Sequence, residues 1–263
     1  MCLIAFAWQA HARYRLVVAA NRDELHARPT APAAFWNDAP RVYAGRDLKD
    51  GGTWMGVTGS GRFAALTNFR DPNEFKAGAP SRGALVANFL REATLPHEYA
   101  QSLGAIQYMY NGFNLLVSDS DALWYVGNRS GAPRQVEPGV HSLSNALLDT
   151  PWPKSTGLQA VLAGALAVQP AGQADASNLI AALFGGLGDQ RPAPDAELPQ
   201  TGVGLERERQ LAPRMIVNPV YGTRSATVLL MDYAGNLEMV ERSFTPDGVI
   251  SGTVFQKIPA AGL

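Results

Sequence analysis

The chain has 263 residues, of which 46% are hydrophobic and 17% charged, and its formal net charge is −1. This composition predicts one domain over residues 1–263, and its scattered Lys and Arg residues predict no nucleic-acid partner. The single cysteine cannot form an internal disulfide, and no apolar run reaches the about 20 residues that cross a bilayer. We therefore expect a cytoplasmic protein with no integral membrane segment.

The first third of the sequence predicts two β-hairpins followed by a helix. Apolar and β-branched runs indicate strands over residues 3–8, 14–20, 53–57 and 63–68. The first hairpin ends in Asn21-Arg22-Asp23-Glu24, and a loop with three prolines separates it from the second. Ser81 is a suitable N-cap for a helix that continues to Ala93.

The rest of the chain predicts further helices and strands in alternation. Helices are expected over residues 96–110, 156–168 and 177–184, and strands over 113–117, 123–126, 139–144, 224–233 and 237–244. Residues 185–213 are rich in Gly and Pro and predict an irregular segment. Hairpins near both ends with helix pairs between them indicate an α+β protein in which helices cover the sheets.

Several common types of site are not expected. The sequence has no Gly-x-Gly-x-x-Gly or Gly-Lys-Ser/Thr motif of the kind that binds nucleotide phosphates. Its four His residues are dispersed without metal-ligand spacing, so no metal site is predicted. His141 and Ser142 are adjacent in a predicted strand, and their side chains would point to opposite faces.

Cys2 is the cysteine of the chain and directly follows Met1. If Met1 is removed, the thiol and the new α-amino group belong to one residue, which unites a nucleophile with its own general base. The alternative is that Cys2 is a small apolar residue at the start of a buried strand. The residue by itself leaves both interpretations open.

The polar run Asn21-Arg22-Asp23-Glu24 follows the apolar residues 16–20. Four consecutive polar residues are usually a solvated turn. The apolar residues before them favour a partly buried position, where Arg22 would pair with Asp23 or Glu24. The run lies where the first strand of the hairpin begins, so it would place donors and carboxylates near Cys2.

Six motifs, taken in order along residues 1 to about 233, resemble the NRDE family, also called the transport and Golgi organisation protein 2 family. They are Met1-Cys2, Asn21-Arg22-Asp23-Glu24, Gly52-Thr53-Trp54-Met55-Gly56, Ala65-Leu66-Thr67-Asn68-Phe69-Arg70, Ser142-Leu143-Ser144-Asn145 and Tyr221-Gly222-Thr223-Arg224-Ser225. The resemblance implies the N-terminal nucleophile (Ntn) hydrolase fold, an αββα sandwich of four layers. This fold agrees with the α+β layers expected from the elements.

The sequence is more distantly similar to the cholylglycine hydrolases and penicillin V acylases, which cleave non-peptide amides. That similarity implies that Cys2 is the nucleophile and that Asp23 holds its α-amino group. It also implies that Asn68 and Asn145 supply oxyanion-hole or amine-orienting amides and that Arg224 lies near the thiolate. By themselves, the two asparagines are also ordinary turn residues, and Arg224 an ordinary structural cation.

One position departs from the hydrolase pattern. Those enzymes read Arg-Asn-x-Asp at the end of the second strand, whereas this chain reads Ala20-Asn21-Arg22-Asp23. Arg22 is on the same strand face as Ala20 and could replace the missing Arg from a position about 7 Å further along the strand.

Two functions remain open. The first is an amide hydrolase that uses Cys2, with residues 185–213 as a mobile lid. The second is an intracellular carrier of haem or an acyl lipid, since family members are implicated in haem trafficking. The expected ligand is small and amphipathic: an N-acyl amide for the hydrolase, or haem or an acyl lipid for the carrier. For each of these ligands the expected binding residues are Asn21, Arg22, Glu24 and Arg70. No cofactor is required, and haem, if it binds, needs an axial ligand such as Cys2 or a His.

Overall fold

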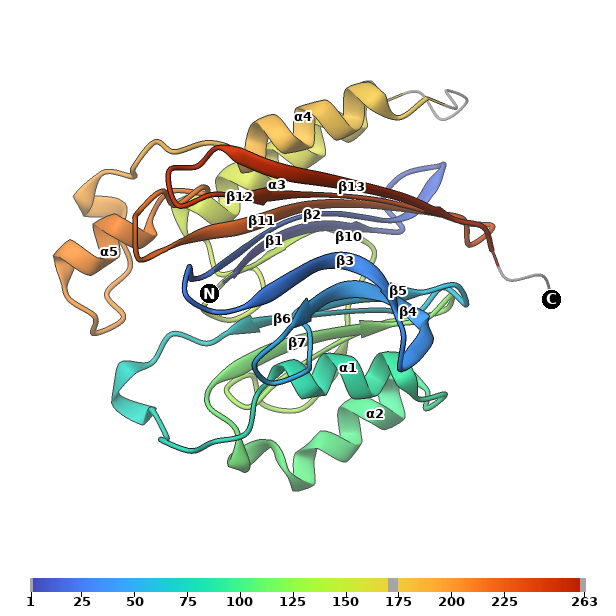
Figure 1. Cartoon of the computed structure of the whole chain (residues 1–263), viewed down its shortest axis with the longest axis horizontal. Helices are drawn as coiled ribbons and strands as arrows, with labels where there is room; N and C mark the ends of the chain where they lie inside the picture. The colour runs from blue at the N-terminus through green and yellow to red at the C-terminus, as the bar shows by residue number, and fades with distance from the viewer. Residues whose placement is uncertain (1, 170–174, 261–263) are drawn as a thin grey trace.

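Two antiparallel β-sheets lie face to face in the computed structural model, which describes residues 2–169 and 175–260 (Figure 1). The six-stranded sheet has the order β10-β1-β2-β11-β12-β13. Its strands are β1 (Cys2–Trp8), β2 (Tyr14–Leu25), β10 (Gly139–Leu143), β11 (Tyr221–Asp232), β12 (Leu237–Phe244) and β13 (Ile250–Ile258). The seven-stranded sheet runs from β3 to β9 in chain order. Its strands are β3 (Thr30–Trp36), β4 (Ala39–Asp47), β5 (Met55–Thr58), β6 (Phe63–Asn68), β7 (Phe113–Ser118), β8 (Leu123–Gly127) and β9 (Arg134–Gln135).

Helices cover the outer face of each sheet (Figure 1). The helices α3 (Pro153–Val168) and α4 (Ser177–Leu187) pack on the six-stranded sheet, and α1 (Gly83–Arg91) and α2 (Pro96–Ser102) on the seven-stranded sheet. The predicted α+β fold with four αββα layers is therefore confirmed. None of the helices in the described part of the chain is long and apolar enough to span a bilayer.

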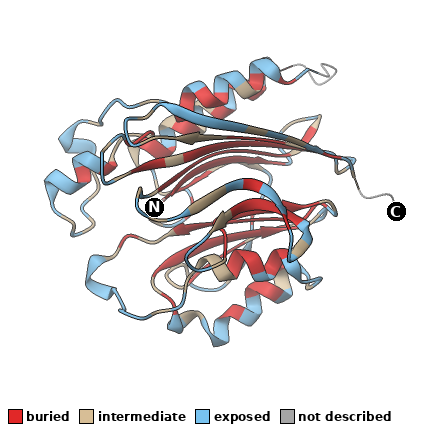
Figure 2. Ribbon diagram, viewed as in Figure 1, coloured by how far each residue is buried: buried red, intermediate tan, exposed pale blue. Residues whose placement is uncertain are grey.

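Strand alternation divides the interior into separate apolar layers. Figure 2 shows that buried residues, in red, run along both sheets and occur on the helices that cover them. In β1, Ile4, Phe6 and Trp8 pack between the two sheets. Leu3, Ala5 and Ala7 pack instead against α3 and α4. Cys2 belongs to the layer between the sheets, at the first position of a strand that has β10 on one side and β2 on the other. The structure therefore places Cys2 at the start of an interior strand.

The prediction of a proline-rich loop after the first hairpin is wrong. This part of the chain forms the hairpin of β3 and β4 instead. Because β3 is the edge strand of its sheet and has a register shift between Ala31 and Ala34, it tolerates the missing N–H of Pro32.

Strand β2 is longer than predicted and continues through Leu25. Its last residues pair with β11, so Asn21, Arg22 and Asp23 are buried strand residues rather than a solvated turn. The partly buried position expected for this polar run is therefore the observed one.

The helix boundaries differ in detail from the prediction. Helix α1 begins at Gly83 with Arg82 at the N-cap, so the Ser81 side chain does not cap it. The predicted second helix ends at Ser102 and continues as two short 3₁₀ turns. Strand β13 was not predicted, because most of its side chains are exposed and show no apolar alternation.

His141 of the edge strand β10 forms an ion pair with Asp149, its Nδ1 lying 2.8 Å from the Asp149 Oδ2. Its Nε2 lies 3.0 Å from the Glu137 carbonyl oxygen, so both ring nitrogens face acceptors. The hydrogen bond to Asp149 raises the pKa of His141. Burial would raise the pKa of Asp149, but the hydrogen bond from His141 contributes to a net lowering.

The stabilising effect of this pair is expected to be largest between the ordinary pKa values of 3.8 for Asp and 6.5 for His. The raised pKa of His141 gives a contribution that is lost as the pH rises through it, and the lowered pKa of Asp149 gives one lost as the pH falls through it. Urea unfolding of wild type and Asp149→Asn should therefore differ more at pH 5 than at pH 9. Equal differences at the two pH values would contradict this.

Candidate active site

A cleft of about 780 Å³ opens between the two sheets, at the end where β1 begins and β2 ends. Its lining residues come from both sheets and from the segment that precedes α1, and they include Cys2, Asp23, Asn68 and Arg224. Four of the five predicted catalytic residues therefore line one cleft, although they are far apart in sequence.

Cys2 lies at the floor of this cleft, directly opposite Arg22 in the pairing of β1 with β2. Its side chain is 6% exposed, and burial raises the pKa of the thiol. The Cys2 carbonyl oxygen accepts a hydrogen bond of 3.1 Å from the Ser144 hydroxyl. The start of β1 is thus held in place from the neighbouring chain segment.

Asp23 is buried beside β11, where its Oδ1 accepts a 2.7 Å hydrogen bond from the Thr223 hydroxyl. Burial raises the pKa of Asp23, and the nearby charge of Lys154 partly opposes that increase. Lys154 is itself buried in α3 and donates to the Leu211 carbonyl oxygen. The sequence prediction missed Lys154, because a lone lysine at the start of a helix gives no signal of burial.

The two predicted amide residues have different positions. Asn68 ends β6 and lines the cleft. Asn145 lies behind it, 1% exposed and outside the cleft lining, and its Nδ2 donates 2.9 Å to the Asn68 carbonyl oxygen. Ser144 donates to the Oδ1 of Asn145. A continuous series of hydrogen bonds therefore links Cys2, Ser144, Asn145 and Asn68. Asn145 therefore positions the site from behind.

Arg224 reaches the cleft but binds the backbone. Its Nη1 donates to the carbonyl oxygens of Leu25, His26 and Arg28 at 2.9 to 3.1 Å. These bonds fix the turn that follows β2. The guanidinium thus has a structural role in addition to its place in the cleft lining.

Arg22 does not form the expected pair with Asp23 or Glu24. Its guanidinium lines the cleft and donates to the Thr30 hydroxyl at 3.4 Å. Glu24 also lines the cleft, and one of its oxygens accepts from the Leu25 backbone N–H. Arg22 and Glu24 are therefore placed where a ligand could reach them.

Asn21 and Arg70, also predicted to bind ligand, lie outside the cleft. Strand alternation turns Asn21 to the helix-covered face, where it donates to the carbonyl oxygens of Leu187 and Arg214. Arg70 is buried and pairs with Glu208 at 2.5 Å. Both side chains are bonded within the protein, so the structure gives neither a ligand-binding position.

The segment 185–213 does not cover the cleft, since none of its residues is among those that line it. It contains the helix α5 (Leu205–Leu211), and Glu208 of this helix attaches the segment to Arg70. The predicted lid is therefore wrong. The high Gly and Pro content concealed a short helix that a buried ion pair holds in place.

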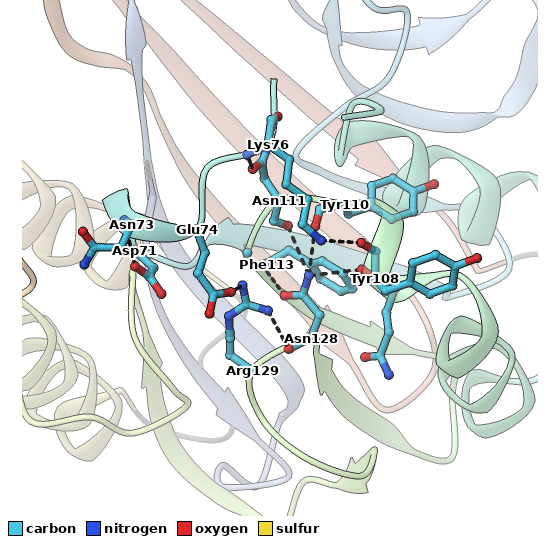
Figure 3. A network of polar contacts seen from close by, with 12 residues as sticks. Asp71, Asn73, Glu74, Lys76, Tyr108, Tyr110, Asn111, Phe113, Asn128 and Arg129 are labelled. Carbon is cyan, nitrogen blue, oxygen red and sulfur yellow. Dashed lines mark hydrogen bonds and ion pairs between the residues drawn. The ribbon is translucent and has the colours of Figure 1, made fainter. Parts of the chain in front are cut away.

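Another segment, residues 75–83, forms one rim of the cleft and is bonded to the loop before β7 (Figure 3). Lys76 and Asn111 exchange two hydrogen bonds, from Lys76 N to Asn111 Oδ1 at 2.7 Å and from Asn111 Nδ2 to the Lys76 carbonyl oxygen at 3.0 Å. The Lys76 ammonium also donates to the Tyr108 carbonyl oxygen, and Arg129 pairs with Glu74. These contacts fix the rim relative to the seven-stranded sheet.

The same rim leads into α1, whose first turn is in close contact with the Gly52 backbone. A Cβ atom at Gly52 would lie 2.5 Å from the Gly83 carbonyl carbon. Gly52→Ala is therefore expected to destabilise the protein by about 1 to 3 kcal/mol, because the backbone of α1 must shift. Urea unfolding measures this effect.

Gly164→Ala is the matched control for Gly52→Ala. Gly164 lies within α3, and a Cβ atom there meets nothing within 4 Å. Since Ala has the higher helix propensity, the control should be stabilised by up to about 1 kcal/mol. Equal stability changes in the two variants would show that the close approach at Gly52 is unimportant.

The described residues include no group of three or more His, Cys, Asp or Glu side chains placed to hold a metal ion.

A match to the family described as Transport and Golgi organisation 2 covers residues 1–246. The chain belongs to this family. It is 36% identical to the Transport and Golgi organization protein 2 homolog of Bos taurus, over 92% of this chain and 93% of that protein. The Drosophila melanogaster family member is 29% identical over 98% of each chain.

A solved structure shows which fold this Transport and Golgi organisation 2 protein shares. The C2A mutant of conjugated bile acid hydrolase from Clostridium perfringens superposes with a TM-score of 0.50, covering 98% of this chain and 92% of that one at 9% identity. At this identity the likeness establishes a shared Ntn-hydrolase fold. The family and the fold that the six sequence motifs indicated are thus confirmed.

Proposed function

We propose that this protein is an N-terminal-cysteine hydrolase of non-peptide amides, with Cys2 as the nucleophile once Met1 is removed. The observation that carries the proposal is the position of Cys2, which begins an interior strand and lines the floor of a cleft. Met1 lies outside the described residues. Its removal is therefore a requirement of the proposal to be measured.

In the proposed reaction the Cys2 sulfur attacks the amide carbonyl carbon and the thiol proton passes to the free α-amino group. The C–N bond then breaks, the nitrogen takes that proton and leaves as an amine, and the acyl group remains on sulfur as a thioester. Attack by water breaks the C–S bond, releases the carboxylic acid and returns a proton to the thiol.

Asn68 is the best-placed donor for the oxyanion in this scheme. It lines the cleft with Cys2, and its side chain makes no hydrogen bond to the other described residues. An amide N–H aimed at the developing oxyanion is worth about 3 kcal/mol, so Asn68→Ala should lower kcat by about 10²- to 10³-fold.

Burial raises the pKa of Cys2, which opposes formation of the thiolate. In the proposed enzyme the α-amino group removes the thiol proton at the moment of attack, and the positive charge of Arg22 favours the anion. Asp23, buried beside the start of β1, would hold the protonated α-amino group.

A carrier of haem or an acyl lipid is the second candidate. It is favoured by Asn145 and Arg224, which the protein's own backbone carbonyls engage, and by Ala20, which stands where the hydrolases have Arg. Cys2 would be the axial ligand for haem, since no His is among the described residues that line the cleft.

An intact-mass measurement combined with an amidase assay distinguishes the hydrolase from the carrier. A hydrolase should show loss of Met1 and turnover of at least one compound from a panel of N-acyl aminocoumarin amides. A protein that retains Met1, cleaves none of the panel and binds haem saturably is a carrier, and the hydrolase proposal is then wrong.

A further inference from the structure

Arg22 and Arg82 line the cleft, and neither forms an ion pair with an acidic residue of the described part of the chain. Arg22 is 8% exposed and donates to the Thr30 hydroxyl. Arg82, half-buried, donates 2.8 Å from Nη1 to the Gly112 carbonyl oxygen. Burying a cation without an ion partner is unfavourable, so these two charges need an explanation.

Two other cations of the cleft lining are neutralised by carboxylates within the protein. Arg28 pairs with both Asp47 and Asp50 at 2.5 Å, and Arg46 pairs with Asp38 at 2.6 Å. Among the residues that the structure describes, the lining cations without a carboxylate partner are Arg22, Lys49, Lys76, Arg82 and Arg224.

Three acidic side chains in the lining could still have opposed the arginines. Glu241, near Arg22, accepts from the Ala33 N–H at 2.8 Å and from the Thr227 hydroxyl at 3.5 Å, so it is held by β3 and β11. Asp23 is bonded to Thr223, and Glu24 accepts from the Leu25 N–H. These bonds hold the carboxylates in place without removing their charge, but the lining contains seven Arg and Lys residues against five Asp and Glu residues, so its formal charge is positive.

Arg82 is also the N-cap of α1, a helix of nine residues whose N-terminus meets the cleft at Ser81 and Gly83. The cap has no side-chain hydrogen bond. The helix dipole therefore adds a positive potential in the same place as the Arg82 guanidinium. The close approach of Gly52 to Gly83 fixes this end of the helix against the cleft.

Arg82 and Arg22 are both near Cys2. Burial lowers the pKa of Arg82, and the nearby Cys2 and Glu24 oppose that decrease. Arg22 lies directly opposite Cys2 in the strand pairing. Cys2, Arg22 and Arg82 also line the same cleft.

We propose that Arg22 and Arg82 form an anion subsite beside Cys2, which binds a carboxylate or phosphate of an acyl ligand. The inference rests on the proposed function in that this cleft is the substrate site, and it narrows the substrate class to acyl compounds with an anionic group near the reacting carbonyl. Apolar cleft residues, Pro32, Trp54, Leu66 and Phe244 among them, are available to the acyl chain.

The test is isothermal titration calorimetry on a Cys2→Ala background, so that turnover cannot affect the result. The probes are octanoate, octyl phosphate and octanamide, which share one chain length and differ in charge. The parent should bind at least one anion 10-fold or more tighter than octanamide, and the tighter anion identifies carboxylate or phosphate as the preferred group. Arg82→Gln should weaken the binding of that anion 10- to 100-fold and of octanamide less than twofold.

Arg91→Gln is the matched control, because Arg91 is at the opposite end of α1, outside the cleft lining, and should leave all three affinities unchanged. If Arg82→Gln does not fold by circular dichroism, Arg82→Lys, which keeps the charge, should retain the preference for the anion. Equal binding of octanamide and the anions by the parent, equal weakening of all probes, or no binding of any probe would overturn the inference. Absence of amidase turnover with Arg82-dependent anion binding would instead reject only the hydrolase.

Discussion

Replacing Cys2 with Ala is expected to abolish amide hydrolysis, with kcat lowered by about 10³-fold or more, because the attacking sulfur is lost. The fold should remain intact, since the change removes one sulfur atom from a side chain at the end of a strand whose backbone bonds to β2 and β10 persist. The measurement is kcat on the best amide of the aminocoumarin panel, with the circular dichroism spectrum as the check on folding.

Cys2→Ser refines this result. Serine preserves the size of the side chain but is a weaker nucleophile, so residual activity should be low in this variant as well. Ser144→Ala is the control that loses the hydrogen bond to the Cys2 carbonyl oxygen while it keeps the thiol. Activity in Cys2→Ala equal to wild type would show that another group performs the reaction, and the role given to Cys2 would be wrong.

Glu208→Gln is expected to lower the free energy of unfolding by about 3 to 5 kcal/mol, because it leaves the Arg70 guanidinium buried without an ion partner. The side chains of Arg70 and Glu208 are 5% and 4% exposed. Thr201 also donates to Glu208 through its N–H and its hydroxyl. Glu208 is therefore the attachment point of the whole segment around α5.

Urea unfolding measures this loss, and Glu206→Gln on the same helix is the matched control. Glu206 is exposed, and its Oε2 is 3.4 Å from Arg209, so its replacement should change stability by less than about 0.5 kcal/mol. The double variant Arg70→Met with Glu208→Leu should recover much of the stability, since it removes both buried charges. A loss below about 1 kcal/mol in Glu208→Gln would contradict the importance of the pair.

The sequence was sufficient to predict the layered fold and the position of Cys2, because both depend on local patterns. Alternating apolar residues specify β1 and β2, and the ordered motifs identify the family. The strands β3, β4, β9 and β13 were missed. Strands β3, β9 and β13 are edge strands with largely exposed side chains, so their stability comes from backbone pairing, which leaves little trace in the residue pattern. Strand β4 lies in the segment whose three prolines indicated a loop.

The roles of single polar residues could be predicted only in part. Strand period two correctly separates Asn21 from Arg22, yet it does not reveal that Asn21 binds the carbonyls of Leu187 and Arg214 on the far face. Arg82 and Glu208 were missed, because their importance depends on contacts between residues far apart in the chain. No local pattern distinguishes such a residue from an exposed charge.

The wall of the cleft formed by β13 has a consequence for ligand preference. Ser251, Gly252, Thr253 and Val254 line the cleft, but they lie beyond residue 246, where the family match ends. Their strand is held by its backbone pairing with β12, so the side chains can change with little effect on folding. Substitutions in this one strand would therefore change the surface that the cleft presents to a ligand while the thiol-bearing part of the site stays the same.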